Sequence, residues 1–296
     1  MNVILNRRTF LLASAVVSAS YSLGTLAGAN RDDASFQDRL AKLEQKLNGR
    51  LGVCAIDTAD GAQLGYRANE RFAMNSTFKV MLASAFLARS QDEPGLLEER
   101  LTYTRADLVT YSPVTEKHVV TGMTVAELCA AGIQYSDNTA ANMLMKKLGG
   151  PEAVTAFARS IGDTHFRLDR WETELNSAIP GDPRDTNTPQ AMAMSLQRLA
   201  LGDMLAADKQ HQLQAWLKGN TTGGKRIRAG VPAGWQVGDK TGTGDYGSAN
   251  DVAILWPPRH APVVLALYSA LENPQAEARN DVLADAARIV AEWVTG

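Results

Sequence analysis

The sequence has few of the residues from which metal sites and disulfide frameworks are built. Its 296 residues include only two cysteines and four histidines. The histidines are His118, His165, His211 and His260. They show none of the H-x-H or H-E-x-x-H spacing that is typical of metal-binding pairs. We therefore expect no metal ion and no cofactor, which excludes metal-dependent hydrolysis.

The two cysteines form no recognisable pair. Cys54 lies in a run with strand character, whereas Cys129 lies in a run with helical character. In an oxidising compartment the two could form a disulfide. Nothing in the sequence brings them together, so the pattern favours two buried free thiols over a bridge.

An excess of charge of one sign is also missing. The formal net charge is -2, with 45% hydrophobic and 21% charged residues. A nucleic-acid-binding chain would normally show a basic face. The composition is that of an ordinary soluble globular protein, and the length allows one large domain or two lobes. We expect a monomer that binds a small molecule and no nucleic acid.

The first 29 residues resemble an export signal. Arg7 and Arg8 precede an apolar stretch at 10–17, and small residues follow up to Ala27-Gly28-Ala29. A charged start, a short apolar run and an A-x-A site predict a cleavable signal peptide. The alternative, a membrane anchor, would need a longer apolar run. The arginine pair also resembles a twin-arginine signal, although Sec signals can carry it too. We expect a periplasmic or secreted protein with no stable membrane association after cleavage.

Hydrophobic periodicity divides the remaining chain into helical and strand-like parts. Helical spacing occurs at 35–48 and 76–88, through much of 124–219, and over the last 20 residues. Strand patterns occur at 51–57, 63–67, 236–240, 251–256 and 263–270. Residues 163–187 are polar and contain two prolines, with no periodic stripe. A loop of that length inside a domain is usually functional.

This order predicts an α/β (α+β) fold with one domain at 30–296. Both ends of the domain, about 30–67 and 220–296, supply an antiparallel sheet with flanking helices. The middle, about 68–219, supplies an all-helical lobe. We expect the site in the crevice between the two lobes.

Ser76-Thr77-Phe78-Lys79 is the first candidate for chemistry. On a helix, residues three apart share a face, so Lys79 would lie beside the Ser76 hydroxyl. Such an amine can activate a serine nucleophile, and a helix N-terminus directs backbone N–H groups at a developing oxyanion. The alternative is a helix that Ser76 caps, with an exposed lysine.

Two further clusters carry complementary groups. Ser136-Asp137-Asn138 precedes a predicted helix at 139–148, and offers a hydroxyl for proton relay and an amide for substrate positioning. Lys240-Thr241-Gly242 ends a predicted strand, and offers a cation, a hydroxyl and a glycine that allows close backbone approach. In isolation each could equally be a helix cap or a turn.

The three clusters together stand in the order and approximate spacing of the penicillin-recognising serine enzymes. Stretches 135–141, 166–176 and 238–247 resemble Gram-negative class A β-lactamases, including extended-spectrum and carbapenem-hydrolysing branches. The resemblance covers essentially the whole chain after the signal. It implies hydrolysis of penicillins and cephalosporins through an acyl-enzyme on Ser76, and therefore β-lactam resistance.

A fourth stretch, Arg170 to Asn176, resembles the omega loop of that family. The resemblance makes Glu172 the general base for deacylation and Asn176 its partner in holding the hydrolytic water. It pairs Arg170 with Asp185 in a salt bridge that closes the neck of the loop. A salt bridge of this kind can be bidentate and buried.

The same resemblance assigns the remaining parts of the catalytic cycle. The backbone N–H groups of Ser76 and Thr243 form the oxyanion hole, and Ser136 passes a proton to the ring nitrogen. Either Lys79 or Glu172, acting through water, removes the proton of Ser76. Which of the two is the base is disputed for the family.

Substrate contacts also follow from the resemblance. Tyr111 matches an aromatic at the cleft rim, Asn138 a contact to the acylamide, and Asp245 a position near cephalosporin side chains. The substrate carboxylate would meet Lys240, Arg226 and the segment Thr241-Gly242-Thr243.

The chain departs from the family at its disulfide positions. Asn75 and Gly244 stand where many carbapenem-hydrolysing members have a cysteine pair. Cys129 matches half of another family disulfide, whose partner position is Ala83. Neither bridge can form.

Two other activities share part of this pattern. A penicillin-binding D-Ala-D-Ala peptidase has the three clusters without the Glu172–Asn176 pair. A non-catalytic sensor domain acylates and stops, and is normally tethered to a membrane. Steady turnover of nitrocefin separates a hydrolase from both.

Overall fold

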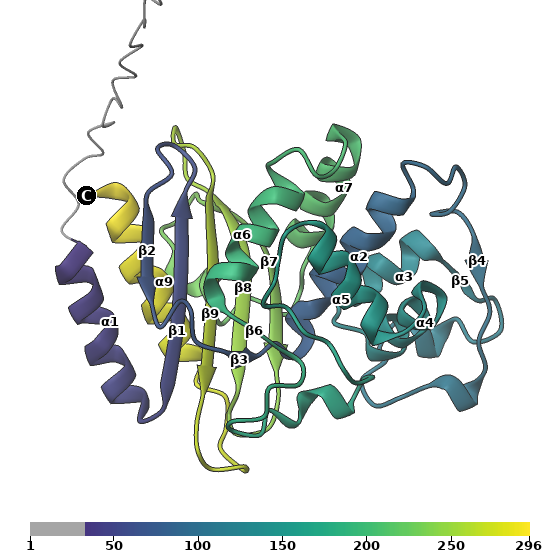
Figure 1. The fold of residues 1–296 in the computed structure, drawn as a ribbon, viewed down its shortest axis with the longest axis horizontal. Helices are drawn as coiled ribbons and strands as arrows, with labels where there is room; N and C mark the ends of the chain where they lie inside the picture. The colour runs from purple at the N-terminus through teal and green to yellow at the C-terminus, as the bar shows by residue number, and fades with distance from the viewer. Residues whose placement is uncertain (1–32) are drawn as a thin grey trace, which may run out of the picture. The chain divides into compact units, whose positions relative to one another are not determined.

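The centre of the fold is a five-stranded antiparallel sheet. The structure, a computed structural model, describes residues 33–296, so the predicted signal peptide lies outside the described residues. The sheet contains β1 (Arg50–Asp57), β2 (Gln63–Tyr66), β7 (Gln236–Thr243), β8 (Ala249–Trp256) and β9 (Val263–Ala270). Its order is β2-β1-β9-β8-β7, and every pairing is antiparallel (Figure 1). The two ends of the domain thus build one sheet, as predicted.

Both faces of this sheet are covered, because side chains on a strand point alternately to opposite sides. In β1, Cys54 and Ile56 belong to the hydrophobic core on the helical side. Leu51, Val53 and Ala55 belong to a second core on the other face. Because β1 and β9 are buried on both faces, they are apolar in most positions and appear in the sequence as apolar runs.

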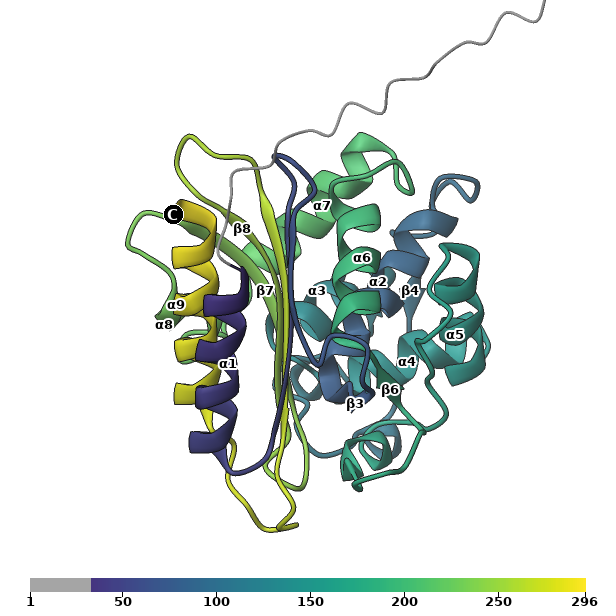
Figure 2. The ribbon, with the colours of Figure 1, turned by 60° about the vertical axis from the view of Figure 1, so that its left-hand side comes forward.

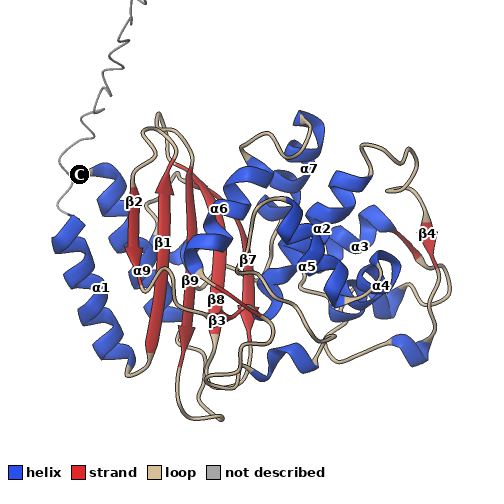
Figure 3. Ribbon diagram, in the orientation of Figure 1, coloured by secondary structure: helices blue, strands red, loops and turns tan. Residues whose placement is uncertain are grey.

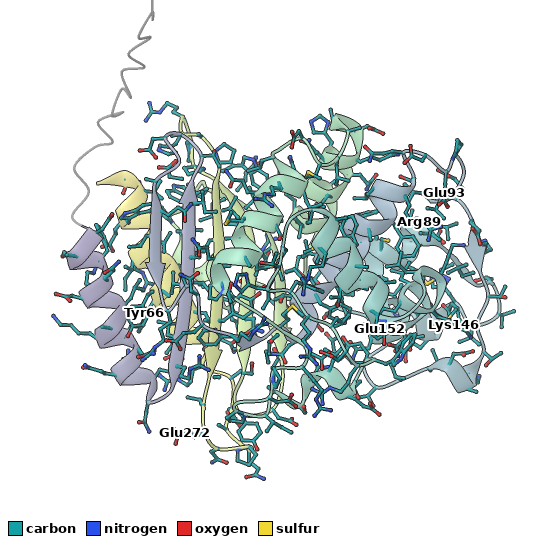
Figure 4. All side chains as sticks on the ribbon, in the orientation of Figure 1. Tyr66, Arg89, Glu93, Lys146, Glu152 and Glu272 are labelled. Atoms are coloured by element: carbon teal, nitrogen blue, oxygen red, sulfur yellow. The ribbon has the colours of Figure 1, made fainter. Side chains whose placement is uncertain are left out.

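The second core is closed by the two terminal helices, α1 (Asp33–Leu47) and α9 (Asn280–Thr295). Figure 2 shows them side by side against one face of the sheet. The Trp293 indole of α9 donates a hydrogen bond to Asp33 of α1 at 2.7 Å. Tyr66, at the edge of the sheet in Figure 4, donates to Glu44 of α1 at 2.9 Å.

The other helices lie on the opposite face and beyond it (Figure 3). They are α2 (Phe78–Arg89), α3 (Val125–Gln134), α4 (Asn138–Leu148), α5 (Pro151–Ser160), α6 (Pro189–Ala200) and α7 (Ala207–Lys218). The short α8 (Ile227–Gly230) is the exception, because it packs against α9 on the face that α1 covers. Ten of the twelve residues of α2 are buried, which makes it the central helix of this group. Two helices of the predicted helical lobe cover the sheet itself, since α6 packs on β1 and β9, and α7 on β7.

Short elements connect these layers. The strand pairs β3 (Phe72–Ala73) with β6 (Thr186–Asn187) and β4 (Arg100–Leu101) with β5 (Met123–Thr124) are two residues long. The 3-10 turns are η1 (Asn75–Thr77), η2 (Arg105–Asp107), η3 (Thr115–Lys117) and η4 (Glu174–Ser177). Residues 163–187 are otherwise irregular, as the lack of periodicity indicates.

Two sequence expectations need correction. Ser76 does not cap the long helix, because it lies in η1, one turn before α2, and no side chain caps either element. The predicted strand at 236–240 is too short, because β7 runs to Thr243 and includes Lys240-Thr241-Gly242. Both differences arise because the two segments pack against each other, a long-range contact that local patterns do not report.

The prediction of two free, buried thiols is confirmed. Cys54 and Cys129 are free and buried, and burial raises the pKa of the Cys54 thiol to about 12. No helix within residues 33–296 is long and apolar enough to cross a membrane. The same residues contain no group of three or more His, Cys, Asp or Glu side chains placed to hold a metal ion.

Candidate active site

Ser76 is held at the contact between η1 and β7. The preceding Asn75 has a left-handed backbone (φ 45°), and its side-chain amide donates to the Ser248 hydroxyl at 2.8 Å. A Cβ on Gly242 would lie 2.8 Å from the Met74 carbonyl oxygen and 3.2 Å from the Ser76 nitrogen. Glycine is therefore what allows β7 to approach the backbone of the serine.

Lys79, one turn further along the chain, points back at this serine. Its Nζ donates to Ser76 Oγ at 3.0 Å, to the Ser136 carbonyl at 2.9 Å and to Asn138 Oδ1 at 2.6 Å. It also lies 2.9 Å from Glu172 Oε1, and both side chains are fully buried. An ammonium has three protons for these four acceptors, so its hydrogen bonds compete.

Glu172 approaches the serine from the omega loop, residues 163–187. Its Oε1 lies 3.3 Å from Ser76 Oγ, and its Oε2 accepts from Asn176 Nδ2 at 2.6 Å. The backbone of Glu172 is held on both sides by Asn142, whose Oδ1 accepts from its N–H and whose Nδ2 donates to its carbonyl. The carboxylate therefore belongs to a rigidly attached part of an irregular loop.

The sequence analysis did not identify Asn142 as a site residue. It follows Asn138 by four residues on α4, so both amides share a helix face directed at the site. The four-residue spacing could have placed Asn142 on the same helix face as Asn138. It could not have shown that Asn142 binds the omega loop, because that contact is made only in the folded protein.

Asn176 carries an unused hydrogen-bond acceptor. Its Oδ1 is buried and has no partner among the described residues, although its amide nitrogen binds Glu172. Buried polar atoms are nearly always hydrogen-bonded, often to ordered water. This oxygen and the Glu172 carboxylate therefore offer adjacent acceptors to a water molecule beside Ser76.

The residues of the Ser136-Asp137-Asn138 cluster have different roles. Asp137 caps α4 by accepting from the Ala140 N–H at 2.8 Å, which confirms the capping interpretation for that residue. Ser136 has a left-handed backbone (φ 58°), which directs its carbonyl to Lys79 and its hydroxyl to Lys240. The same three residues are thus a helix cap and a part of the site.

Lys240 enters from β7 on the opposite side. Its Nζ donates to Ser136 Oγ at 3.0 Å and to the Thr241 carbonyl at 2.6 Å. The side chain is completely buried. Burial, together with the like charge of Lys79, holds the pKa of Lys240 well below its ordinary value.

Arg226 lies behind β7 and reaches the cleft through a hydroxyl. Its guanidinium donates to the carbonyls of Gly242 and Asn250 at 2.6 and 2.7 Å, and to Asn280 at 2.7 Å. The remaining hydrogen bond, 2.7 Å long, goes to Thr243 Oγ1. Because that oxygen accepts from the arginine, its own proton is free to donate into the cleft.

The cleft between the two sides has a volume of about 360 Å³. It is lined by Ser76, Tyr111, Ser136, Asn138, Asn176, Thr222, Arg226, Thr241, Gly242 and Thr243. Lys79, Glu172 and Lys240 are buried beneath these residues. Tyr111, more than half exposed, stands at the rim as predicted.

The lining of the cleft includes Thr222, which the sequence did not indicate, and does not include Asp245. Thr222 was missed, yet its hydroxyl lies 2.5 Å from the Thr241 hydroxyl in the cleft wall. Asp245 does not line the cleft, and its backbone N–H donates to the Asn176 carbonyl at 2.9 Å. Asp245 thus connects the end of β7 to the omega loop.

The neck of the omega loop is closed by an ion pair. Arg170 Nε donates to Asp185 Oδ2 at 2.6 Å, and Asp185 Oδ1 accepts from the backbone N–H groups of Asp169 and Arg170. The Asp185 side chain is buried. The predicted partners therefore meet, but through one guanidinium nitrogen and two backbone groups.

A buried serine in contact with both a lysine and a carboxylate, at the floor of a cleft between a sheet and a helical group, defines a serine hydrolase. The chain belongs to the β-lactamase enzyme family, whose sequence model matches residues 35–294. Within that family it is a class A serine β-lactamase.

Named relatives agree over nearly the whole chain. Beta-lactamase OXY-1 of Klebsiella oxytoca is 56% identical over 286 residues, which is 97% of each chain. Carbapenem-hydrolyzing beta-lactamase KPC of Klebsiella oxytoca is 59% identical over 253 residues, or 85% of this chain and 86% of that protein. The crystal structure of a β-lactamase from Desulfarculus baarsii superimposes with a TM-score of 0.89 at 61% identity, covering 90% of this chain and 99% of that one.

Proposed function

We propose that the protein opens the β-lactam ring of penicillins and cephalosporins through an acyl-enzyme on Ser76 and hydrolyses that ester with water activated by Glu172. One observation carries the proposal: the Ser76 hydroxyl lies within 3.0 Å of Lys79 Nζ and 3.3 Å of Glu172 Oε1. The expected consequence in a bacterial host is resistance to β-lactams.

Acylation begins when Ser76 Oγ loses its proton and attacks the ring carbonyl carbon. Lys79 and Glu172 are both within reach of that proton, so the geometry supports either as the base. The backbone N–H groups of Ser76 and Thr243 would stabilise the oxyanion. In hydrolases one such donor contributes on the order of 10²–10³ in rate.

Ring opening breaks the bond between the carbonyl carbon and the ring nitrogen, which then needs a proton. Ser136 supplies it. Since Lys240 donates to the Ser136 oxygen, the hydroxyl proton of Ser136 is free to point at the substrate.

Deacylation uses a water molecule held by Glu172 and the unpartnered Oδ1 of Asn176. Glu172 removes its proton, the water oxygen bonds to the acyl carbon, and the ester bond to Ser76 breaks. The serine recovers its proton, so the enzyme is ready for another cycle.

The substrate carboxylate is the proposed ligand of the sheet side of the cleft. Lys240 has one ammonium proton left after its two hydrogen bonds, and Thr243 has a free hydroxyl proton directed by Arg226. Thr241 adds a second hydroxyl. Tyr111 and Asn138 lie on the opposite wall, where the acylamide side chain would fit.

Nitrocefin turnover tests the reaction class. Absorbance should continue to rise long after one equivalent of substrate has been opened. A stoichiometric burst without steady turnover would contradict the proposal and would indicate a peptidase or a sensor domain.

Glu172→Ala tests the mechanism. Without the base, the variant should accumulate a penicilloyl-enzyme visible by intact mass, and its kcat should fall on the order of 10²–10⁴-fold. Glu174→Ala is the matched control, because Glu174 is an exposed carboxylate two residues away in the same loop. Parental turnover in Glu172→Ala would remove Glu172 from the mechanism.

We also propose that residues 1–29 are an export signal, that 30–296 is one β-lactamase domain, and that the mature enzyme is a periplasmic or secreted monomer. Osmotic-shock fractionation with N-terminal sequencing tests export and the cleavage site. Replacing Arg7 and Arg8 by lysine tests the twin-arginine route against Sec. Size-exclusion chromatography with light scattering tests the oligomeric state.

A further inference from the structure

Two aspartates lie together beneath the sheet side of the cleft, outside the machinery described so far. Asp239 is on β7 and Asp251 on the neighbouring β8, and both are completely buried. Asp251 is paired with Thr241, two positions from Asp239, so the two carboxyls are diagonal neighbours on one face of the sheet. That face is the one toward Arg226, Ile227 and Arg228.

The partners of the two carboxyls are unequal. Asp239 Oδ1 accepts from Arg228 Nε at 2.6 Å, and Asp239 Oδ2 accepts from Asn220 Nδ2 at 2.7 Å. Asp251 accepts only a backbone bond, from the Ile227 N–H to Oδ2 at 3.1 Å. Its Oδ1 is buried with no donor among residues 33–296.

An unpartnered buried carboxylate oxygen is costly unless it carries a proton. Two adjacent buried carboxyls cannot both ionise readily, and one of them then keeps its proton. Burial and the neighbouring Asp239 raise the pKa of Asp251 well above its ordinary value, while Arg226 and the Ile227 N–H oppose this only in part. Asp239 has Arg228 and Asn220 as hydrogen-bond donors, whereas Asp251 Oδ1 has no donor among residues 33–296, so the geometry assigns the proton to Asp251.

The charged groups around this pair belong to the substrate side of the site. They are Arg226 and Arg228 beside and in α8, Lys240 on β7, and, acting on Lys240 from the helical side, Lys79 and Glu172. Arg228 forms an ion pair with Asp239, whereas within residues 33–296 neither Lys240 nor Arg226 forms an ion pair with a carboxylate. A second anion at Asp251 would neutralise one of them.

We propose that Asp251 holds a proton that it donates to Asp239, and that this acid–carboxylate pair is a positioning element which keeps the positive charge of Lys240 and Arg226 available for the substrate carboxylate. The link to substrate rests on the proposed function. The assignment of a proton to Asp251 does not depend on the proposed function.

Carbon-13 NMR of the full enzyme labelled at aspartate Cγ tests the proton directly. At neutral pH one aspartate should give the signal of a protonated carboxyl. Asp251→Asn should abolish it because the acid is gone. Asp239→Asn should abolish it too, because Asp251 then loses its anionic neighbour and ionises beside Arg226 and Arg228. The proposal is overturned if all aspartates titrate near their ordinary value of about 4, or if the acid signal survives either substitution.

The alkaline limb of the kcat/KM–pH profile tests the link to Lys240. The double variant Asp239→Asn/Asp251→Asn removes both carboxyls on the sheet side of Lys240 and leaves only Glu172 on the helical side, so the alkaline limb of its profile should move to lower pH by about one unit. Asp251→Asn alone keeps the Asp239 carboxyl paired with Arg228, so the alkaline limb of its profile should stay nearer that of the parent. Equal displacement in both variants would refute the positioning role. Absence of nitrocefin turnover in the parent would refute the proposed function instead, and would leave the NMR result standing.

Discussion

The two sides of the cleft each contribute a buried lysine, and the two lysines are held in opposite ways. Lys79, on the helical side, is 2.9 Å from the Glu172 carboxylate, so its charge is compensated inside the protein. Lys240, on the sheet side, binds a hydroxyl and a carbonyl, and burial lowers its pKa. The helical side is therefore built to exchange protons, whereas the sheet side is built to receive an anion.

This contrast predicts opposite effects of the same substitution on stability. Lys79→Met leaves the Glu172 anion buried without its partner and should lower the free energy of unfolding by about 3–5 kcal/mol. Lys240→Met removes an uncompensated buried cation and should leave stability equal to or above that of the parent, at the expense of activity. Urea unfolding of the two variants checks this. Similar losses of unfolding free energy in both variants would show that the two lysines are not held in different ways.

The omega loop offers a second test of compensated charge. Arg170→Gln leaves Asp185 buried without its cation and should cost about 3 kcal/mol. It should also slow deacylation, because the loop carries Glu172. Arg184→Gln is the control, since its pair with Asp182 is in the same loop but exposed, and surface pairs contribute little. Unfolding and single-turnover kinetics measure both effects. Equal behaviour of the two variants would contradict a structural role for the neck.

The lowered pKa of Lys240 should be visible in the pH dependence of KM. A lysine loses its charge as the pH rises through its pKa, so a lowered pKa moves that loss to lower pH. KM for an anionic penicillin should therefore rise on the alkaline side sooner than an ordinary lysine would allow. Lys240→Arg keeps its charge throughout and should remove that rise. Profiles of the parent and the variant check this, and coincident alkaline limbs would show that Lys240 is not the titrating group.

The packing of the two sides predicts the smallest effect. A Cβ on Gly244, next to β7, would lie 2.3 Å from Asn75 Oδ1 and 2.5 Å from the Asn176 carbonyl, so Gly244→Ala should lose about 1–3 kcal/mol. A Cβ on Gly132, in α3, would meet no atom within 4 Å, and Gly132→Ala should gain roughly 0.5–1 kcal/mol. Thermal unfolding measures both. If Gly244→Ala were stabilising, the omega loop would have to move away from β7 without a loss of stability.

Much of this site could be predicted because its groups are carried by short motifs. Ser76-x-x-Lys79 and the Glu172–Asn176 pair each fix a spacing, and the structure brings both pairs together. The missed residues have no such motif. Thr222, Asn142 and the Asp239–Asp251 pair acquire their roles only from neighbours distant in sequence. Asp245 shows the reverse, because its match to the family did not indicate that its backbone N–H would bind the omega loop.

The sequence by itself determined the types of element and the chemical groups available. Apolar runs specify the strands, and the motifs specify a hydroxyl, two ammonium groups and a carboxylate. Only the tertiary structure decided which charges meet, because a buried charge is stabilised by what lies within a few ångströms of it and not by its neighbours in the chain. That is why Lys79 and Lys240, so alike in the sequence, differ in the fold.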